Sequence, residues 1–234
     1  MFVRIKSGAY IGLNCYLVDV EVDSSKGLPG QSIVGLPDAS VKESRDRVKA
    51  AICNSGYEFP LGYFTINLAP ADTRKEGPMY DLPIAIGILG SSGQVPMDAL
   101  KDTAVFGELS LDGALRSVEG ILPMCMTAVK NGIKKVIVPK DNADEAALVR
   151  NIDVIPAVDF NYALDYLNGK ILVIPHKVNI EAIFENEGQY DIDFSEIKGQ
   201  FHVKRAIEIA CAGSHNIMKL WTQIYTYLLS LLSL

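Results

Sequence analysis

The sequence predicts a globular α/β domain, and three observations support this fold class. Hydrophobic residues make up 49% of the 234 residues, which is enough to build a large buried core. Period-two patterns typical of strands alternate along the chain with helical patterns. Gly, Pro, aromatic and charged residues occur at ordinary frequencies, so disordered, collagen-like and disulfide-stapled classes are excluded.

The first two strands are expected close to the N-terminus. Residues 14–23 alternate hydrophobic and acidic side chains, as in a strand with one buried face. A Gly- and Pro-containing turn at residues 27–30 leads to a short β-rich segment, residues 31–36. These segments predict a sheet at the start of the domain.

A helix is expected after the second strand. Ser40 and Glu43 form a capping box, whose side chains satisfy free backbone N–H groups at a helix start. Hydrophobic residues recur at helical spacing on one face of this segment, which ends near residue 54. Lys42, Arg45 and Lys49 share another face, so the helix presents a basic stripe.

The remaining elements continue the alternation. Residues 81–89 form an almost uninterrupted apolar stretch that suits a buried helix, although length alone does not distinguish it from a buried strand. Asp112-Gly113 is expected to form a hairpin turn. Further strands are expected at residues 63–69, 104–111, 134–139 and 152–158, and helices at residues 120–131, 142–149 and 160–167.

The domain organisation follows from where this alternation ends. The α/β domain is expected to comprise residues 1–170. Residues 171–197 are acidic and irregular and are interpreted as a linker. Residues 198–218 regain a helical pattern and are interpreted as the opening of a second domain, followed by an aberrant apolar tail, residues 219–234.

Charge and hydropathy restrict the partners and the location. The net charge of −6 at pH 7 excludes a protein whose entire surface binds nucleic acid, because phosphate binding requires Lys and Arg. A local basic patch is compatible with this charge. The N-terminus lacks the features of a signal peptide, so a cytoplasmic location is expected. The apolar C-terminal run is shorter than the ~20 residues that span a bilayer, so no membrane partner is expected.

Motifs for cofactor or metal binding are not found in the sequence. A P-loop requires Gly-x-x-x-x-Gly-Lys followed by Ser or Thr, whereas Gly169-Lys170 is followed by Ile171 and lacks the earlier glycine. The cysteines lack the paired spacing of a zinc or redox site and are expected to be buried thiols; they are Cys15, Cys53, Cys125 and Cys211. The histidines are expected to be surface or linker residues; they are His176, His202 and His215. Neither a metal nor a cofactor is therefore expected.

Several segments, spread in order over residues 1–218, resemble the N-terminal domain of the ComM/YifB family of magnesium-chelatase-like AAA+ ATPases. They include residues 34–38 (VGLPD), 67–72 (NLAPAD), 75–85 (KEGPMYDLPIA) and 107–113 (GELSLDG). The resemblance implies the ribosomal-protein-S5-domain-2-like fold of the Lon proteolytic domain. Intact members of the family use ATP and magnesium, form rings and act in DNA branch migration and recombination during natural transformation.

The relation to Lon provides a test for peptidase chemistry. Lon-type peptidases use a serine that follows a Lys-Asp-Gly-Pro segment, with a lysine further along the chain as its base. By resemblance, Lys75-Glu-Gly-Pro78 preserves this frame, but Met79 occupies the serine place and Leu122 the lysine place. Neither a thioether nor an isobutyl group attacks a carbonyl or accepts a proton, so no catalytic residue is expected at either position.

The resemblance also implies a contact surface, because related Lon-like domains without protease activity support ring assembly and contact DNA. The candidate contacts to DNA or to a neighbouring subunit are Lys42, Arg45 and Lys49 on the helix, with Arg74 and Lys75 in the following loop. A solvated helix face and an ordinary loop are the alternative interpretation.

Three functions follow from these observations. The first is a non-catalytic assembly, DNA-binding or partner-binding domain of a ComM/YifB-type ATPase. The second is a Lon-like serine peptidase with another nucleophile, Ser91 or Ser92. The third is a non-functional remnant of a frameshifted gene, because the resemblance stops at Met218, before the P-loop that the family carries.

Overall fold

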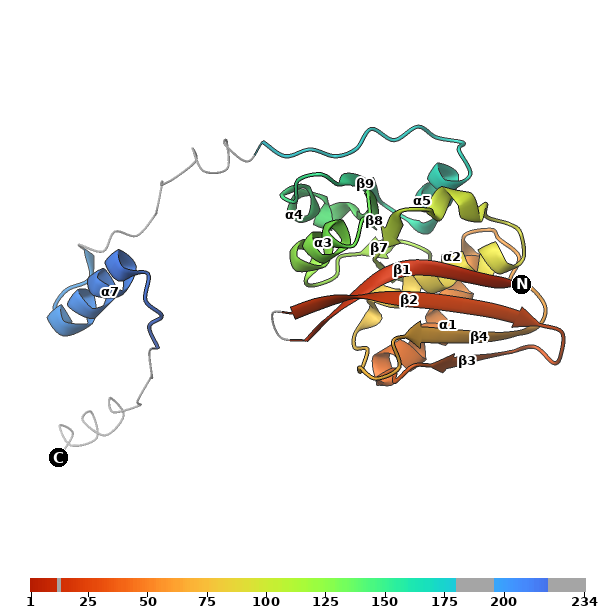
Figure 1. The fold of residues 1–234 in the computed structure, drawn as a ribbon, viewed down its shortest axis with the longest axis horizontal. Helices are drawn as coiled ribbons and strands as arrows, with labels where there is room; N and C mark the ends of the chain where they lie inside the picture. The colour runs from red at the N-terminus through yellow and green to blue at the C-terminus, as the bar shows by residue number, and fades with distance from the viewer. Residues whose placement is uncertain (12–13, 180–195, 219–234) are drawn as a thin grey trace, which may run out of the picture. The chain divides into compact units, whose positions relative to one another are not determined.

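The structure is a computed structural model that describes residues 1–11, 14–179 and 196–218. The chain divides into two units, Met1–Glu181 and Ala182–Leu234. The first unit contains the sheet and most of the helices, and the second contains the helix α7 (Figure 1). Each unit is described by itself.

The first unit is built on a seven-stranded mixed sheet with the order β3-β4-β2-β1-β5-β8-β9. β1 and β2 form a long antiparallel hairpin, and β2 pairs antiparallel with β4. The other neighbouring pairs in the sheet are parallel. The strands are β1 (Phe2–Ile11), β2 (Asn14–Ser25), β3 (Gly30–Val34), β4 (Tyr63–Ala69), β5 (Thr103–Val105), β8 (Lys135–Pro139) and β9 (Asp153–Ala157).

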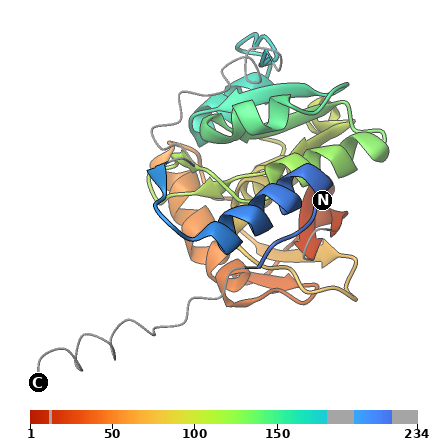
Figure 2. The same cartoon turned by 90° about the vertical axis from the view of Figure 1, so that its left-hand side faces the viewer.

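Helices cover this sheet from both faces. All residues of α2 (Asp81–Ser91) are buried, and Gly87 lies so close to β2 that a Cβ would be 2.6 Å from Val22 Cγ2. α3 (Ile121–Lys130) reaches the opposite face of β1, where Met124 lies beside Gly8. Figure 2 shows the orange α1 well separated from the green α3. The other helices of the unit are α1 (Ala39–Asn54), α4 (Ala143–Ala147) and α5 (Phe160–Leu167), with 3₁₀ turns η1 (Pro78–Tyr80), η2 (Met97–Leu100) and η3 (Lys140–Asn142).

A buried ion pair connects α1 to α2. The Asp81 carboxylate is fully buried and accepts hydrogen bonds from Arg47 Nε at 2.9 Å and Arg47 Nη2 at 3.2 Å. The Leu109 N–H also donates to this carboxylate, at 3.2 Å. Arg47 additionally donates to Ser40 O and Ser44 Oγ within its own helix. One guanidinium therefore holds together the two helices that pack on the first half of the sheet.

Several predicted elements are confirmed and others need correction. The apolar segment at residues 81–89 is the helix α2, and the Asp112-Gly113 turn joins β6 (Glu108–Leu109) to β7 (Leu115–Arg116) as a hairpin. The single strand expected at residues 104–111 is wrong. It divides into β5 and β6 because the chain turns at Gly107, whose N–H bonds to Met79 O. β1 was not predicted from the sequence.

The predicted cap of α1 is also wrong. Asp38 rather than Ser40 caps α1, because its side chain accepts a hydrogen bond from Val41 N at 2.7 Å. Asn142 is the N-cap residue of α4, but its side chain makes no capping hydrogen bond. Its amide instead bonds to both backbone groups of Val118, at 2.9 and 3.0 Å, and so joins two loops.

The cysteine prediction holds for one of the four residues. Cys125 is buried in α3, and burial raises the pKa of its thiol to about 12. Cys15 is partly buried, whereas Cys53 and Cys211 are exposed. The expectation of four buried thiols is therefore wrong.

The expected linker begins against the first unit. The His176 N–H donates to Val154 O at 2.8 Å, and His176 Nε2 lies 2.7 Å from Asp144 Oδ1. The first residues of the segment 171–197 therefore lie along β9, beyond the predicted boundary at residue 170. The later part of the linker, residues 180–195, and the tail, residues 219–234, lie outside the described residues.

The second unit contains α7 (Phe201–Gly213), which lies within residues 198–218, where the sequence predicts a helical pattern. Its role as the opening of another domain stays a prediction. Over the described ranges of both units, no helix is long and apolar enough to cross a membrane.

Candidate nucleic-acid interface

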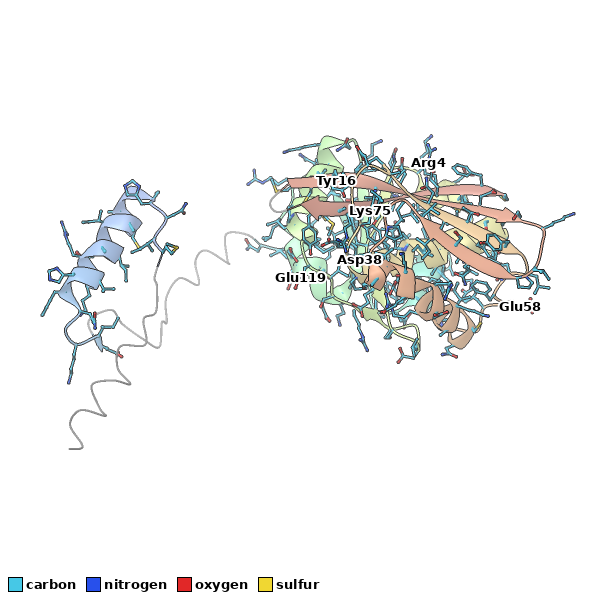
Figure 3. The ribbon with its side chains drawn as sticks, turned by 90° about the horizontal axis from the view of Figure 1, so that it is seen from below. Arg4, Tyr16, Asp38, Glu58, Lys75 and Glu119 are labelled. Carbon is cyan, nitrogen blue, oxygen red and sulfur yellow. The ribbon has the colours of Figure 1, made fainter. Side chains whose placement is uncertain are left out.

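The five basic residues of the predicted contact surface occupy three different environments. Lys75 is fully buried, and its Nζ donates to Thr73 O at 2.8 Å and also to Pro70 O. Removal from water lowers the pKa of Lys75. Figure 3 shows Lys75 between Tyr16 and Asp38. The inclusion of Lys75 in a contact surface is therefore wrong, because its ammonium group is sealed inside the loop that it stabilises.

The stripe on α1 is exposed, as the sequence predicts. Lys42, Arg45 and Lys49 lie at positions i, i+3 and i+7 of the helix and are exposed to solvent. Arg45 Nε lies 3.5 Å from the exposed carboxylate of Asp46, and Lys49 Nζ lies 5.8 Å from the ring centroid of Phe59. Ion pairs this exposed contribute little, so these cations are available to a ligand.

The N-terminal pocket, with a volume of about 370 Å³, lies at the start of the stripe. Lys42 and Arg74 line it together with residues 36–39. The exposed Arg74 forms an ion pair with Glu76 at 3.4 Å. Lys42 and Arg74 therefore meet at one cavity, although they are far apart in the sequence.

The backbone of Lys75 holds the loop that forms this pocket. Its N–H donates to Leu36 O at 3.1 Å, and its C=O accepts from Asp38 N at 3.0 Å. Gly35 has φ +96, and a Cβ there would lie 2.3 Å from Leu68 O. Leu36 adopts φ +57 while 53% exposed. Such a conformation is unfavourable for leucine, so the surrounding hydrogen bonds impose it.

The α1–β3 pocket, with a volume of about 440 Å³, lies beside the other two basic residues of the stripe. It is lined by Pro29, Gly30, Gln31, Arg45, Asp46, Lys49, Phe59, Pro60 and Leu61. In Figure 3 Asp38, at the N-terminal pocket, and Glu58, next to Phe59, lie toward opposite ends of the orange helix α1. The stripe therefore extends between two cavities on the surface of the first unit.

Gln31 and Phe59 are residues of this surface that the sequence analysis missed. Gln31 pairs with Phe64 across the β3–β4 ladder, and the Phe64 side chain is buried, so Gln31 faces the same layer as α1. The sequence did contain a signal for Gln31: it is a polar residue two positions before the hydrophobic Ile33, on the same face of the strand. Phe59 has no sequence signal, because only the fold places it against Phe64 and Lys49.

Met79 and Leu122, which the resemblance aligns with the Lon-type dyad, lie in η1 and in α3. Met79 is 3% exposed in η1 and lines a pocket of about 300 Å³ with Tyr10, Glu108 and Glu119 among its other residues. Leu122 lies in the first turn of α3, and its backbone N–H donates to a Glu145 carboxylate. These two side chains supply neither a nucleophile nor a base.

The alternative nucleophiles lie at the C-terminal end of α2. Ser91 Oγ donates to Ile88 O and Ser92 Oγ donates to Leu89 O, each at 2.8 Å. Ser91 is buried, at 6% exposure. Among the residues that the structure describes, neither hydroxyl bonds to a lysine or histidine that could act as its base. The same residues contain no group of three or more His, Cys, Asp or Glu side chains that could hold a metal ion.

Comparisons with known proteins match this chain to one family over much of its length. Residues 20–142 match the family described as subunit ChlI of Mg-chelatase, and residues 193–221 match that of magnesium chelatase, subunit ChlI. The uncharacterized protein YifB of Escherichia coli is 44% identical over 214 residues, and the competence protein ComM of Haemophilus influenzae is 41% identical over 215 residues. Both alignments cover 92% of this chain.

A further relative supports the predicted fold. Lon protease 2 of Bacillus subtilis is 33% identical over 109 residues, which are 45% of this chain and 18% of that protein. This similarity and the mixed sheet with mainly parallel pairing agree with a Lon-like α/β fold. The chain spans 41% of the length of YifB and 42% of ComM. It belongs to the magnesium-chelatase ChlI family, among relatives of the YifB and ComM type.

Proposed function

We propose that the first unit is a non-catalytic contact domain that binds the phosphate backbone of DNA, within an ATPase of the ComM/YifB type. The observation behind this proposal is the exposed stripe of Lys42, Arg45 and Lys49, which extends between two surface cavities. Arg74 extends the same basic surface at the N-terminal pocket. Lys75, which is buried, is left out of this surface.

The geometry of the stripe suits a chain of phosphates. From residue 42 to residue 49, α1 rises about 10 Å, a length over which duplex DNA presents about six phosphate charges. Long, exposed Lys and Arg side chains adjust to such a ligand without rearrangement of the backbone. The chain as a whole is acidic, with a net charge of −6, so DNA contact is expected at a local basic surface such as this stripe.

The same proposal includes that the first unit has no catalytic activity of its own. Met79 and Leu122 occupy the Lon-type catalytic places, and the hydroxyls of Ser91 and Ser92 bond to backbone carbonyls. The ATP and magnesium that intact relatives use would be bound by residues outside this unit. ComM is named as a competence protein, and a DNA-contacting domain is consistent with the recombination role that the resemblance implies.

The test measures binding of the full chain to fluorescein-labelled single-stranded DNA by anisotropy at several salt concentrations. Four phosphate contacts correspond to a slope of log Kobs against log[salt] of about −3, and to an affinity that falls about 50-fold between roughly 50 and 200 mM salt. The double variant Arg45→Gln/Lys49→Gln removes two contacts. Its slope is expected to fall in magnitude by about 1.5.

A matched control has the same change of net charge elsewhere. Lys101→Gln/Lys130→Gln alters two exposed lysines that are outside the stripe and both pockets. This variant is expected to retain the slope of the unmodified chain. Equal slopes for the stripe variant and the unmodified chain would refute the proposed function, because backbone phosphates would then not contact these residues.

A further inference from the structure

The α1–β3 pocket contains a polar atom that its surroundings do not satisfy. Gln31 Oε1 is buried and has no hydrogen-bond partner among the described residues. Gln31 forms part of the lining of the pocket, which brings this side chain to a cavity open to solvent. A buried acceptor without a partner destabilises a fold, so rotation of the Gln31 amide from this closed position toward the cavity, where a donor can reach the oxygen, is favourable.

Hydrophobic groups surround this acceptor. Phe59 lines the pocket and packs edge-on against Phe64, with ring centroids 5.6 Å apart. Pro29, Pro60 and Leu61 complete the apolar wall, and Leu61 is 91% exposed at its edge. A flat group that offers N–H donors at its edge and an apolar face would fit this combination of walls.

Cations lie at the same cavity. Arg45 and Lys49 line it from α1, and the Lys49 ammonium lies over the Phe59 ring. Asp46 also lines the pocket, and Arg45 lies 3.5 Å from its carboxylate. The pocket therefore suits a ligand that has an anionic group, a flat aromatic face and a hydrogen-bond donor. A volume of about 440 Å³ lies within the range of ligand pockets.

We propose that the α1–β3 pocket receives one unstacked base of single-stranded nucleic acid. The base lies against Phe59 and donates an N–H to Gln31 Oε1, while Arg45 and Lys49 bind the flanking phosphates. This inference rests on the proposed function and deepens it, because phosphate contact alone requires no pocket. Stacking on an aromatic ring tolerates different bases, whereas Gln31 favours bases with a free N–H at the edge, such as thymine.

The test compares two ligands that carry the same phosphates. One is a short labelled oligodeoxythymidylate, and the other is the same oligonucleotide with abasic sites at its centre. The full chain is expected to bind the abasic oligonucleotide about fivefold more weakly or worse, because the contacts to one base are lost. Lys49→Gln is expected to weaken the binding of both oligonucleotides by a similar factor.

Gln31→Leu distinguishes a binding role from a structural one. Leucine has a similar volume and lacks the unsatisfied oxygen, so the melting temperature is expected to stay unchanged or to rise. The preference for the base-containing oligonucleotide is expected to disappear. Phe59→Leu, which keeps an apolar contact with Phe64, is expected to reduce the same preference.

The outcomes separate this inference from the proposed function. If neither oligonucleotide binds, both are wrong. If the unmodified chain binds both equally, or if Gln31→Leu keeps the preference, the pocket does not receive a base. Salt-dependent binding through Arg45 and Lys49 would still support the proposed function in that case. A preference lost in Gln31→Leu with an unimpaired melting temperature supports the inference.

Discussion

Substitution of Arg47 by methionine tests the buried ion pair that connects α1 and α2. Methionine keeps much of the length of the arginine side chain and removes its charge and its donors. The fully buried Asp81 carboxylate then loses its two bonds to the guanidinium and keeps those from Leu109 N and Ser44. Ser40 O and Ser44 Oγ also lose a donor.

The expected cost follows from burial. Removal of one partner from a buried ion pair typically costs about 3 to 5 kcal/mol, because the other charge is left uncompensated. Here the Arg47 side chain is 22% exposed, so water replaces part of the lost interaction. We therefore expect Arg47→Met to lower the free energy of unfolding by about 3 kcal/mol, at the lower end of that range.

The loss is expected to depend on pH. Burial raises the pKa of Asp81 above its ordinary 3.8, while hydrogen bonds from Arg47 and Ser44 oppose that rise. Without Arg47 the pKa of Asp81 rises further. An acid with a raised pKa in the folded state contributes stability below its unfolded pKa and loses it as the pH rises through the folded pKa. Arg47→Met is therefore expected to be closer to the unmodified chain at about pH 4 than at about pH 7.

Urea denaturation followed by circular dichroism at both pH values measures these differences. The double variant Arg47→Met/Asp81→Asn is the matched control, because asparagine can still accept from Leu109 N without a buried charge. Its free energy of unfolding is expected to be higher than that of Arg47→Met by at least about 1.5 kcal/mol and to lose the dependence on pH that Arg47→Met shows. A loss below about 1 kcal/mol for Arg47→Met, equal at the two pH values, would show that the pair does not hold the helices.

Two further substitutions test the loop beneath the N-terminal pocket. Lys75→Met is expected to leave DNA affinity unchanged in the anisotropy assay, because the ammonium is buried, and to lower the free energy of unfolding by about 1 to 3 kcal/mol, because carbonyl groups lose their donor. A large loss of affinity with intact stability would contradict this. Gly35→Ala is expected to destabilise the fold by at least about 2 kcal/mol in urea, because its Cβ would lie 2.3 Å from Leu68 O. A stability equal to that of the unmodified chain would refute the reasoning.

Local sequence patterns predicted the elements that depend on neighbouring residues. The alternation in residues 14–23 corresponds to β2, and the apolar run in residues 81–89 is the fully buried α2. The stripe of Lys42, Arg45 and Lys49 is exposed as predicted, because the spacing of residues along a helix determines which of them share a face. Resemblance to the ComM/YifB family identified the Lon-like fold, which the Lon relative supports.

Other features could not be predicted because they depend on distant contacts. The break between β5 and β6 occurs where Gly107 bonds to Met79, and the side chain of Asn142, the N-cap residue of α4, bonds to Val118 rather than to its own helix. Local propensity describes a residue and its neighbours, whereas these bonds join segments that only the folded chain brings together. The competing partners were therefore absent from any local pattern.

The sequence by itself determined the family and the basic stripe on α1. Only the tertiary structure decided which charged groups are accessible. It buried Lys75 among the carbonyl groups of its own loop and joined Gln31, Arg45 and Phe59 at one pocket. The physical reason is that burial and cavities arise from packing between segments far apart in the chain, whereas charge and helical spacing are properties of each segment alone.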